Sequence, residues 1–358
     1  MTSRREFLGN IAGAAAGIAF TGCGWHRIAS AQAGPAPQRR REVVVNGKRV
    51  RTVDVHAHCH IPEALAVLGQ QVRYPDLVIG PKRTQSMDEQ GIDIEALSIN
   101  PNFWDKAERD QQAQVVKVQN EKLAEICAKE PERFVALASV ALEYPDLAAQ
   151  QLDEAVKKLA MRGALIGGSV NGKDLSDPKF HPFWAKAEEL GVLIFIHPQG
   201  TPELEASGRL KGSGGLENTI GNPLETTIAL SHLIFEGTLD KYPGLKICGA
   251  HAGGYLPSYI GRSDQVCGTF PSRCTVALKK KPSEYLKQLY FDSLVFTQEG
   301  LRHLIAECGV SQIVMGTDHP FPWTKVAIDY ILDQPGLSDA DRIAMLGGTA
   351  MRLLGIKS

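Results

Sequence analysis

Asp54-Val55-His56-Ala57-His58 ends the first β-strand expected in the body of the chain. Alternate residues of a β-strand share a face, so His56 and His58 should point the same way. Three later apolar runs also stop at a histidine or an aspartate: Ile194-Phe195-Ile196-His197, Cys248-Gly249-Ala250-His251 and Met315-Gly316-Thr317-Asp318. Burying these polar groups separately would be costly. We therefore expect the four strand ends to gather around one site.

The spacing of these runs predicts a (β/α)₈ TIM barrel. Eight strand segments are expected, at 51–58, 94–99, 134–140, 164–169, 192–197, 246–251, 289–295 and 312–317. Helical periodicity is expected between or after them, at 110–129, 147–159, 180–190, 224–241, 298–307 and 340–354. Short apolar runs that alternate with amphipathic segments are typical of repeated βα units. No glycine-rich phosphate turn follows an early strand, which disfavours an open doubly wound sheet. In a closed barrel the strand ends form the mouth where active sites lie.

The residue types at these strand ends favour a metal site. Three imidazoles and one carboxylate, with a water molecule, suit Zn²⁺ or a similar divalent ion. Such an ion lowers the pKa of a bound water toward neutrality and so supplies a usable nucleophile or base. A lone His-x-His pair would be weak support. The pair together with strand-terminal His197, His251 and Asp318 is much stronger.

Longer motifs resemble one known family. They are Met87-Asp88-Glu89-Gln90-Gly91, Pro223-Leu224-Glu225-Thr226-Thr227, His251-Ala252-Gly253-Gly254 with Gly261-Arg262, and Gly316-Thr317-Asp318-His319-Pro320-Phe321-Pro322. From about Val53 to the C-terminus the chain resembles the amidohydrolase-related family, and within it the aminocarboxymuconate-semialdehyde decarboxylases. The resemblance implies a barrel with one metal ion and non-oxidative decarboxylation.

The resemblance also implies the role of individual residues. It assigns the metal ligands as His56, His58, His197 and Asp318. It makes His251 the catalytic acid/base, although binuclear relatives use the equivalent residue as a fifth ligand. No lysine ends the fourth strand, where the binuclear branch carries a bridging one. Arg262 matches an arginine that reaches the neighbouring subunit's site to bind substrate carboxylate, which implies a homodimer; the alternative is a surface salt bridge.

Several expected pocket positions depart from the decarboxylase pattern. Gln199 stands where the family tends to have tryptophan, and Gln85 stands in place of a substrate-binding arginine of the family, with Arg83 close by. His60 continues the alternation beyond the metal pair, so it lines the pocket or lies in an exposed loop. Phe296 stands where the decarboxylases often carry histidine. We list Arg262, His60, Gln199 and Arg83 as substrate-binding candidates, whereas Asp54, Asp292 and Glu225 are expected to support ligands, loops or a helix start.

The N-terminus resembles an export signal. Arg4-Arg5 precedes an apolar run that ends before Ala31-Gln32-Ala33, as in a twin-arginine signal peptide. We therefore expect a signal over 1–33, a linker over 34–50, a barrel domain over 51–358 and a periplasmic location. The apolar run is too short for a membrane span, since about 20 residues are needed. Lipidation at Cys23 is the less favoured alternative. In an oxidising compartment Cys267 and Cys274 could form a disulfide.

Composition narrows the class of function. The formal net charge is -1 and no basic block interrupts the body of the chain, so nucleic acid is not an expected partner. The sequence favours a decarboxylase of a small aromatic or unsaturated carboxylate. The first alternative is a metal-dependent hydrolase of a lactone, ester or amide at the same site. The second is a barrel that only binds a ligand, which the full ligand set and the presence of His251 argue against.

Overall fold

The structure is a computed structural model that describes residues 40–100, 102–323 and 326–357. The expected signal peptide over 1–33, with Cys23, lies outside the described residues. So does the N-terminal part of the expected linker.

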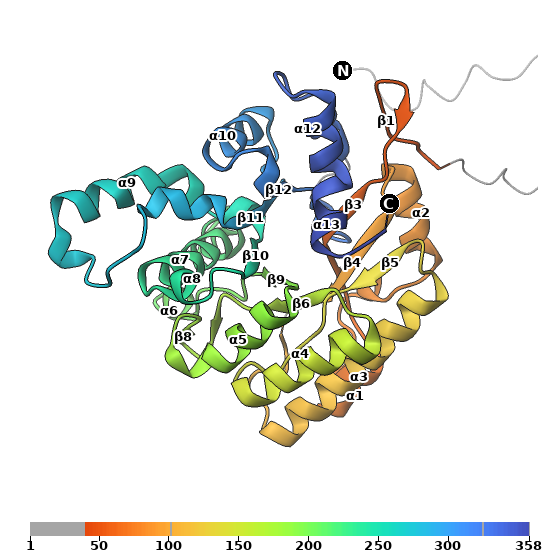
Figure 1. The fold of residues 1–358 in the computed structure, drawn as a ribbon. Coiled ribbons are helices and arrows are strands. Elements are labelled where there is room, and N and C mark those ends of the chain that lie inside the picture. Colours follow the sequence, from red (N-terminus) through yellow and green to blue (C-terminus); the bar gives the residue numbers. More distant parts are fainter. Residues whose placement is uncertain (1–39, 101, 324–325, 358) are drawn as a thin grey trace, which may run out of the picture. The chain divides into compact units, whose positions relative to one another are not determined.

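Eight parallel strands form the barrel (Figure 1). They are β3 (Val53–Cys59), β4 (Ile94–Ile99), β5 (Phe134–Ala136), β6 (Gly163–Ile166), β9 (Leu193–Ile196), β10 (Lys246–Gly249), β11 (Leu289–Asp292) and β12 (Ile313–Val314). The ladders run β3-β4-β5 and β6-β9-β10-β11-β12, and every paired neighbour is parallel. Parallel bridges from Ala138 to Ala164 and from Ala57 to His319 join the two ladders at both seams. The predicted barrel is confirmed, and each of the eight strands overlaps its expected range.

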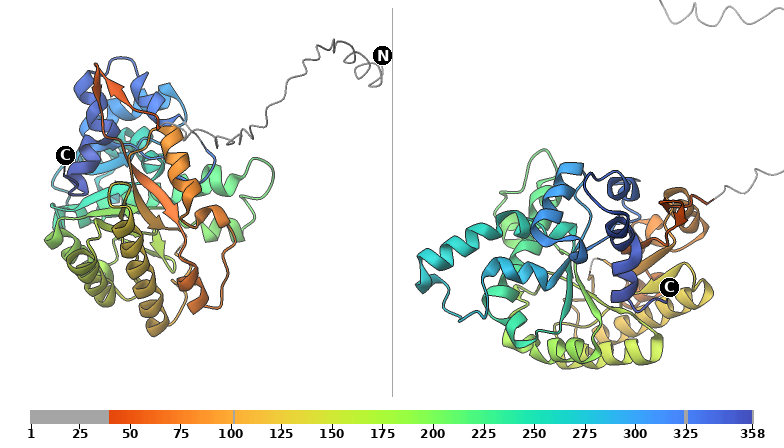
Figure 2. Two further views of the ribbon diagram at one scale, coloured as in Figure 1. Left: turned by 90° about the vertical axis from the view of Figure 1, so that its right-hand side faces the viewer. Right: turned by 45° about the horizontal axis from the view of Figure 1, so that its top comes forward.

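Helices follow most of the strands. The long ones are α2 (Pro81–Gln90), α3 (Arg109–Lys129), α4 (Pro145–Leu159), α5 (His181–Leu190), α7 (Asn222–Phe235), α9 (Leu256–Thr269) and α10 (Gln298–Cys308). The short ones are α1 (Pro62–Val67), α6 (Pro202–Ala206), α8 (Thr238–Lys241), α11 (Ala327–Leu332), α12 (Asp339–Ile343) and α13 (Thr349–Leu353). The expected helix 224–241 is two helices, because Gly237 between them has a left-handed φ of 76°. Helices α2 and α9 were not predicted; α9 projects from the barrel in Figure 1 and in the right panel of Figure 2.

Single-turn segments and two small hairpins complete the described chain. The turns are η1 (Pro75–Leu77), η2 (Pro178–Phe180), η3 (Glu217–Gly221), η4 (His251–Gly253), η5 (Pro271–Arg273), η6 (Pro282–Lys287), η7 (Val310–Gln312) and η8 (Ala344–Gly348). The hairpins are β1 (Val44–Val45) with β2 (Lys48–Arg49), and β7 (Ser169–Val170) with β8 (Lys173–Asp174). η8 joins α12 to α13, so the expected helix 340–354 exists with a π-helical turn inside it.

The buried side chains form two clusters. Seven strands contribute buried residues to the smaller cluster, which is the barrel interior, and the partly buried Tyr290 of β11 packs against it. Helix α13 adds Ala350 and Leu353. The larger cluster lies between the strands and the surrounding helices. Strand residues therefore alternate between an inner and an outer apolar layer, as expected for a barrel covered on its outside.

The expected linker over 34–50 needs correction. Residues from Val43 to Val50 form the β1–β2 hairpin, and Val43, Val45 and Val50 are buried in the larger core cluster. The turn of this hairpin is Asn46-Gly47, with left-handed φ values of 48° and 74°. Asn-Gly is the preferred pair for a two-residue hairpin turn. The proline and arginine content upstream hid this signal, and the folded domain begins before residue 51.

Two further expectations concern cysteines and the membrane. Cys267 and Cys274 form a disulfide with a Cα–Cα distance of 5.5 Å, which confirms the predicted pair. Among the described residues, no helix has the length and apolarity that a membrane crossing requires.

Candidate metal centre

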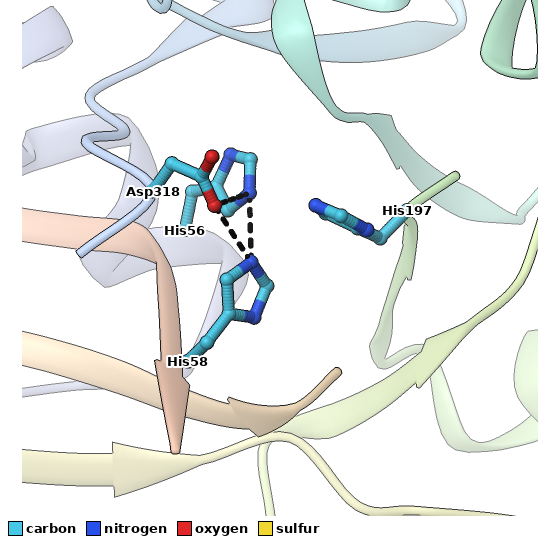
Figure 3. A group of neighbouring side chains, drawn as sticks. All are labelled: His56, His58, His197 and Asp318. Atoms are coloured by element: carbon cyan, nitrogen blue, oxygen red, sulfur yellow. Dashed lines mark hydrogen bonds and ion pairs between the residues drawn. The ribbon is translucent and has the colours of Figure 1, made fainter. Parts of the chain in front are cut away.

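Four side chains converge at the C-terminal mouth of the barrel (Figure 3). His56 and His58 come from β3, His197 directly follows β9, and Asp318 lies in the segment after β12. Their ligand atoms all lie within 4.8 Å of one another, and all four residues are buried. The structure thus brings together the four residues that sequence reasoning named as metal ligands.

The contacts inside this group fit a cation. The Nε2 atoms of His56 and His58 are 3.0 Å apart, and each lies 3.0 to 3.1 Å from Asp318 Oδ1. The buried Nε2 of His197 has no hydrogen-bond partner among the described residues. Buried polar atoms are almost always paired. Three imidazole nitrogens and one carboxylate oxygen that face a common point are a donor set that suits a borderline divalent ion.

Each histidine is oriented by a bond at its other ring nitrogen. The Nδ1 atom of His56 contacts Asp292 Oδ2 at 2.6 Å, that of His58 contacts Ser98 Oγ at 3.2 Å, and that of His197 contacts the carbonyl oxygen of Pro198 at 2.9 Å. Such partners fix the tautomer and leave Nε2 free to bind a metal. Asp292 therefore has the supporting role expected from the sequence.

Asp292 also connects the ligands to the next strand end. Its two oxygens accept hydrogen bonds from the backbone N–H groups of His251, Ala252 and Leu294, at 2.9, 2.8 and 3.2 Å. Burial raises the pKa of this carboxyl group, but the hydrogen bond from His56, the charges of His56 and His251 and the hydrogen bond from the Ala252 backbone together outweigh burial, so the pKa lies below its ordinary value. Asp292 is thus a buried anion that serves both the metal centre and the turn carrying His251.

Asp54 joins the first and last strands below the ligands. It accepts hydrogen bonds from the backbone N–H of His56 and from the hydroxyl of Thr317, at 2.9 and 2.5 Å. Burial raises its pKa to about 7. A backbone hydrogen bond of 2.8 Å from Asp318 to the carbonyl of His56 crosses the same seam. These bonds hold Asp318 in a left-handed conformation, with φ of 62°, that non-glycine residues seldom adopt.

Arg83 occupies a place that the sequence did not predict. Its Nε bonds Glu95 at 2.6 Å, and its terminal nitrogens bond the carbonyl oxygens of His58 and His319 at 3.0 and 3.4 Å. The guanidinium is buried, and Glu95 also pairs with His319 Nδ1 at 2.5 Å. A buried guanidinium engaged in this way supports the backbone behind the ligands. We therefore correct its expected role from substrate binding to structural support.

His251 stands beside the ligand group. It begins η4 with a left-handed φ of 53°, and its ring centroid lies 5.1 Å from those of His56 and His197. Its Nε2 lies 3.7 Å from Asp318 Oδ2, and its Nδ1 is buried without a hydrogen-bond partner among the described residues. This is a position from which an imidazole could exchange protons with a molecule at the metal centre.

The ligand Asp318 and the neighbouring His251 line a cavity of about 500 Å³. Most of its wall is apolar or aromatic, including Tyr255, Phe296 and Trp323, and its polar wall residues include Asn222 and His303. An apolar cleft with a few polar groups is typical of a site for a small organic molecule.

The other predicted substrate residues lie apart from the cavity wall. The side-chain amide of Gln199 donates to Asn100 Oδ1 and accepts from the N–H of Asn102, both at 2.9 Å. His60 is buried and its Nε2 contacts the carbonyl of Asn100 at 3.1 Å. Arg262 is exposed on α9 and has no partner among the described residues. Their roles in substrate binding stay predictions.

The model of the amidohydrolase family matches residues 53–356. The chain belongs to the amidohydrolase family. The match covers the whole barrel and every residue of the metal centre, so the family predicted from the motifs is confirmed.

Relatives within the amidohydrolase family are decarboxylases. The chain is 29% identical over 319 residues to the 2-amino-3-carboxymuconate-6-semialdehyde decarboxylase of Dictyostelium discoideum, covering 88% of this chain and 82% of the relative. It is 30% identical over 275 residues to the gamma-resorcylate decarboxylase of Rhodococcus jostii, covering 73% and 83%. The fold also matches the solved structure of a dihydroxybenzoic acid decarboxylase from Polaromonas sp. JS666, which contains manganese and the inhibitor 2-nitroresorcinol. The TM-score is 0.75 and the sequence identity is 27%, and the match covers 86% of this chain and 97% of that one. The predicted class, a metal-dependent carboxy-lyase, is borne out.

Sequence reasoning missed one part of this amidohydrolase site. The indole N–H of Trp323 donates to Asp318 Oδ2 at 2.6 Å, and the ring lines the cavity. Trp323 lies five residues after Asp318 in an irregular segment, where no strand or helix periodicity assigns a direction to a side chain. Its nearness to the motif around Asp318 was the only available signal.

Proposed function

We propose that this protein is a metal-dependent non-oxidative decarboxylase of small aromatic carboxylates. The observation that carries the proposal is the arrangement at the barrel mouth, where four metal ligands cluster and one of them, Asp318, lines a cavity with an aromatic wall together with His251. The decarboxylase relatives support the reaction, and the dihydroxybenzoate and resorcylate substrates in their names support an aromatic acid. For the ion we propose Zn²⁺, on the donor set of three imidazoles and one carboxylate; a relative with bound manganese makes Mn²⁺ the ion to compare.

The residues of this chain would divide the reaction between them. His56, His58, His197 and Asp318 would hold the ion, which supplies a Lewis acid when bound. Decarboxylation replaces a bond between carbon and carboxylate with a bond between carbon and hydrogen, so a proton must be delivered to the substrate carbon. His251 would deliver it, since its ring lines the cavity and its Nε2 lies 3.7 Å from Asp318 Oδ2. The apolar wall would exclude water from the reacting carbon.

A homodimer and an export route complete the proposal. Arg262 lies exposed on the projecting helix α9, which supports a role in the site of a second subunit. A guanidinium is suited to a carboxylate because its planar fork bonds both oxygens. For location we propose the periplasm, reached through the twin-arginine signal at 1–33. The Cys267–Cys274 disulfide supports an oxidising compartment.

The test combines metal content with product detection. Purified protein, reconstituted with Zn²⁺ or Mn²⁺, is assayed for carbon dioxide release from a panel of hydroxybenzoates and muconate-type acids. We expect about one ion per chain and release from aromatic acids. His251→Ala should keep the ion but lose at least a hundred-fold in rate, which is roughly what a general acid contributes. Cleavage of lactones or esters without carbon dioxide release would instead place the protein among the hydrolases.

A further inference from the structure

Two aromatic side chains in the cavity wall are unusually exposed. Phe296 and Trp323 each expose 45% of their surface, and both line the cavity that contains His251 and Asp318. Large aromatic side chains contribute most to folding when they are buried. Half-exposed rings beside a metal centre contribute little of that energy, whereas a ligand in the cavity would cover them.

The two rings are arranged as a corner. Their centroids lie 6.5 Å apart and their planes make an angle of 66°. This is an edge-to-face geometry, so each ring leaves a face or an edge open. A planar aromatic molecule could therefore stack on one ring and meet the edge of the other. A flexible non-aromatic chain would gain less from the same corner.

The backbone of Phe296 has a strained conformation. Its φ is 58°, in the left-handed region that a bulky non-glycine residue seldom adopts. The hydroxyl of Tyr330, on α11, donates a hydrogen bond of 3.0 Å to the Phe296 carbonyl and holds this conformation. Backbone strain that surrounding contacts maintain is characteristic of functional positions. The position of the Phe296 ring is thus fixed by more than packing.

Trp323 is tied directly to the metal centre. Its indole N–H donates to Asp318 Oδ2 at 2.6 Å, while Asp318 Oδ1 lies 3.0 to 3.1 Å from the Nε2 atoms of His56 and His58. The two oxygens of the Asp318 carboxylate therefore have different partners: Oδ1 faces the ligand nitrogens, and Oδ2 accepts the hydrogen bond of the indole. The same residue fixes the rotation of a ligand and presents a ring to the cavity.

We propose that Trp323 and Phe296 form the subsite for the substrate ring, and that Trp323 is also a positioning residue for Asp318. The proposal rests on the proposed function and names the residues that would favour planar aromatic carboxylates over non-aromatic unsaturated acids. It assigns two separable tasks to one indole. The ring contributes to ring binding and the N–H group contributes to metal retention.

Fluorescence tests the ring contact without turnover. Trp104 and Trp184 are fully buried, so among the described residues Trp323 is the exposed fluorophore. We expect 2-nitroresorcinol to quench part of the tryptophan fluorescence of the zinc-loaded protein. That quenching should be absent in the Trp323→Phe variant. Phe296→Leu keeps apolar volume but loses the ring, and should weaken 2-nitroresorcinol binding about ten-fold, within the range of an aromatic pair and its buried area. Binding of cis,cis-muconate, followed calorimetrically, should change less than two-fold.

Two substitutions at one position separate the two tasks. Trp323→Phe should weaken zinc binding in a chelator competition while leaving KM for an aromatic acid within about three-fold. Trp323→Ala should weaken zinc binding equally and also raise that KM about ten-fold. Tyr74→Ala is the matched control, because Tyr74 is 61% exposed outside the cavity wall, and it should change neither quantity.

The outcomes are distinct from failure of the proposed function. Equal effects of Phe296→Leu on 2-nitroresorcinol and on muconate, or no effect on either, would overturn the ring subsite. Unchanged zinc affinity in Trp323→Phe would overturn the positioning role. If no acid releases carbon dioxide but quenching and its loss behave as expected, the subsite stands and the proposed reaction fails.

Discussion

Asp292→Asn is the substitution that tests the metal centre most directly. The Asp292 carboxylate accepts four N–H groups, from the His56 ring and from the backbone of His251, Ala252 and Leu294. An asparagine has nearly the same shape but replaces one acceptor oxygen with an NH₂ donor. In either orientation of the amide, that donor faces N–H groups. At least one buried donor therefore loses its acceptor.

The magnitude follows from these contacts. Loss of a partner that orients a ligand histidine typically lowers metal affinity 10- to 100-fold. Leaving a buried donor unsatisfied costs about 1–3 kcal/mol of stability. We expect Asp292→Asn to bind zinc at least ten-fold more weakly and, as apoprotein, to lose roughly 2 kcal/mol in the free energy of unfolding. Because the same carboxylate fixes the His251 turn, kcat should also fall when zinc is saturating.

The assay is competition with a chromogenic chelator, together with denaturant unfolding of the apoprotein. Asp146→Asn is the matched control, since Asp146 forms an exposed ion pair with Arg109 and such pairs contribute little. The reasoning would be refuted if Asp292→Asn matched the control in both zinc affinity and stability. A loss of stability with normal zinc affinity would leave Asp292 a core residue without a role in the metal centre.

Two further predictions concern the dimer and pH. Mixing Arg262→Ala with His251→Ala protein should restore activity. If subunits exchange at random and each site needs one intact copy of each residue, the restored rate should reach up to about a quarter of the wild-type rate. If the mixture is as inactive as its parents, Arg262 does not act across subunits. Burial raises the pKa of Glu225 from 4.5 to about 7, so its contribution to stability is present below pH 4.5 and lost as pH rises through 7. Between pH 4.5 and 7 the free energy of unfolding of the wild type should therefore fall by up to roughly 3 kcal/mol more than that of Glu225→Gln. If the free energies of unfolding of both proteins change equally with pH, the prediction is refuted.

The barrel was predictable because each strand is a short apolar run with a polar end. Buried parallel strands need apolar residues on both faces, so the runs are easy to see in sequence. Their order along the chain then leaves few ways to connect them. The ends of β3, β9 and β12 carry the ligands, and barrel geometry alone brings those ends together. This explains why four ligands from three distant parts of the sequence could be named before the fold was known.

The support behind the ligands was harder to predict. Arg83 lies on α2 and bonds carbonyl groups of two strand ends, and no local pattern reveals a contact between a helix side chain and a distant backbone. Trp323 follows the last strand in an irregular segment. Helix α9 carries Gly261 and Gly268, which weaken a helical signal by about 1 kcal/mol each. These features depend on tertiary contacts rather than on periodicity.

His251, the proposed acid/base, and the metal centre share one buried anion, Asp292, and this constrains how either can change. His251 and Asp318 both have left-handed backbones, with φ of 53° and 62°. Strain of this kind persists only where neighbouring bonds fix the conformation. Asp292 supplies such bonds to the His251 turn and orients His56, while the seam between β3 and β12 supplies them to Asp318. A substitution that relaxes the His251 turn would therefore also loosen a metal ligand. The proposed proton delivery by His251 and the retention of the metal would therefore depend on one hydrogen-bonded unit at the barrel mouth.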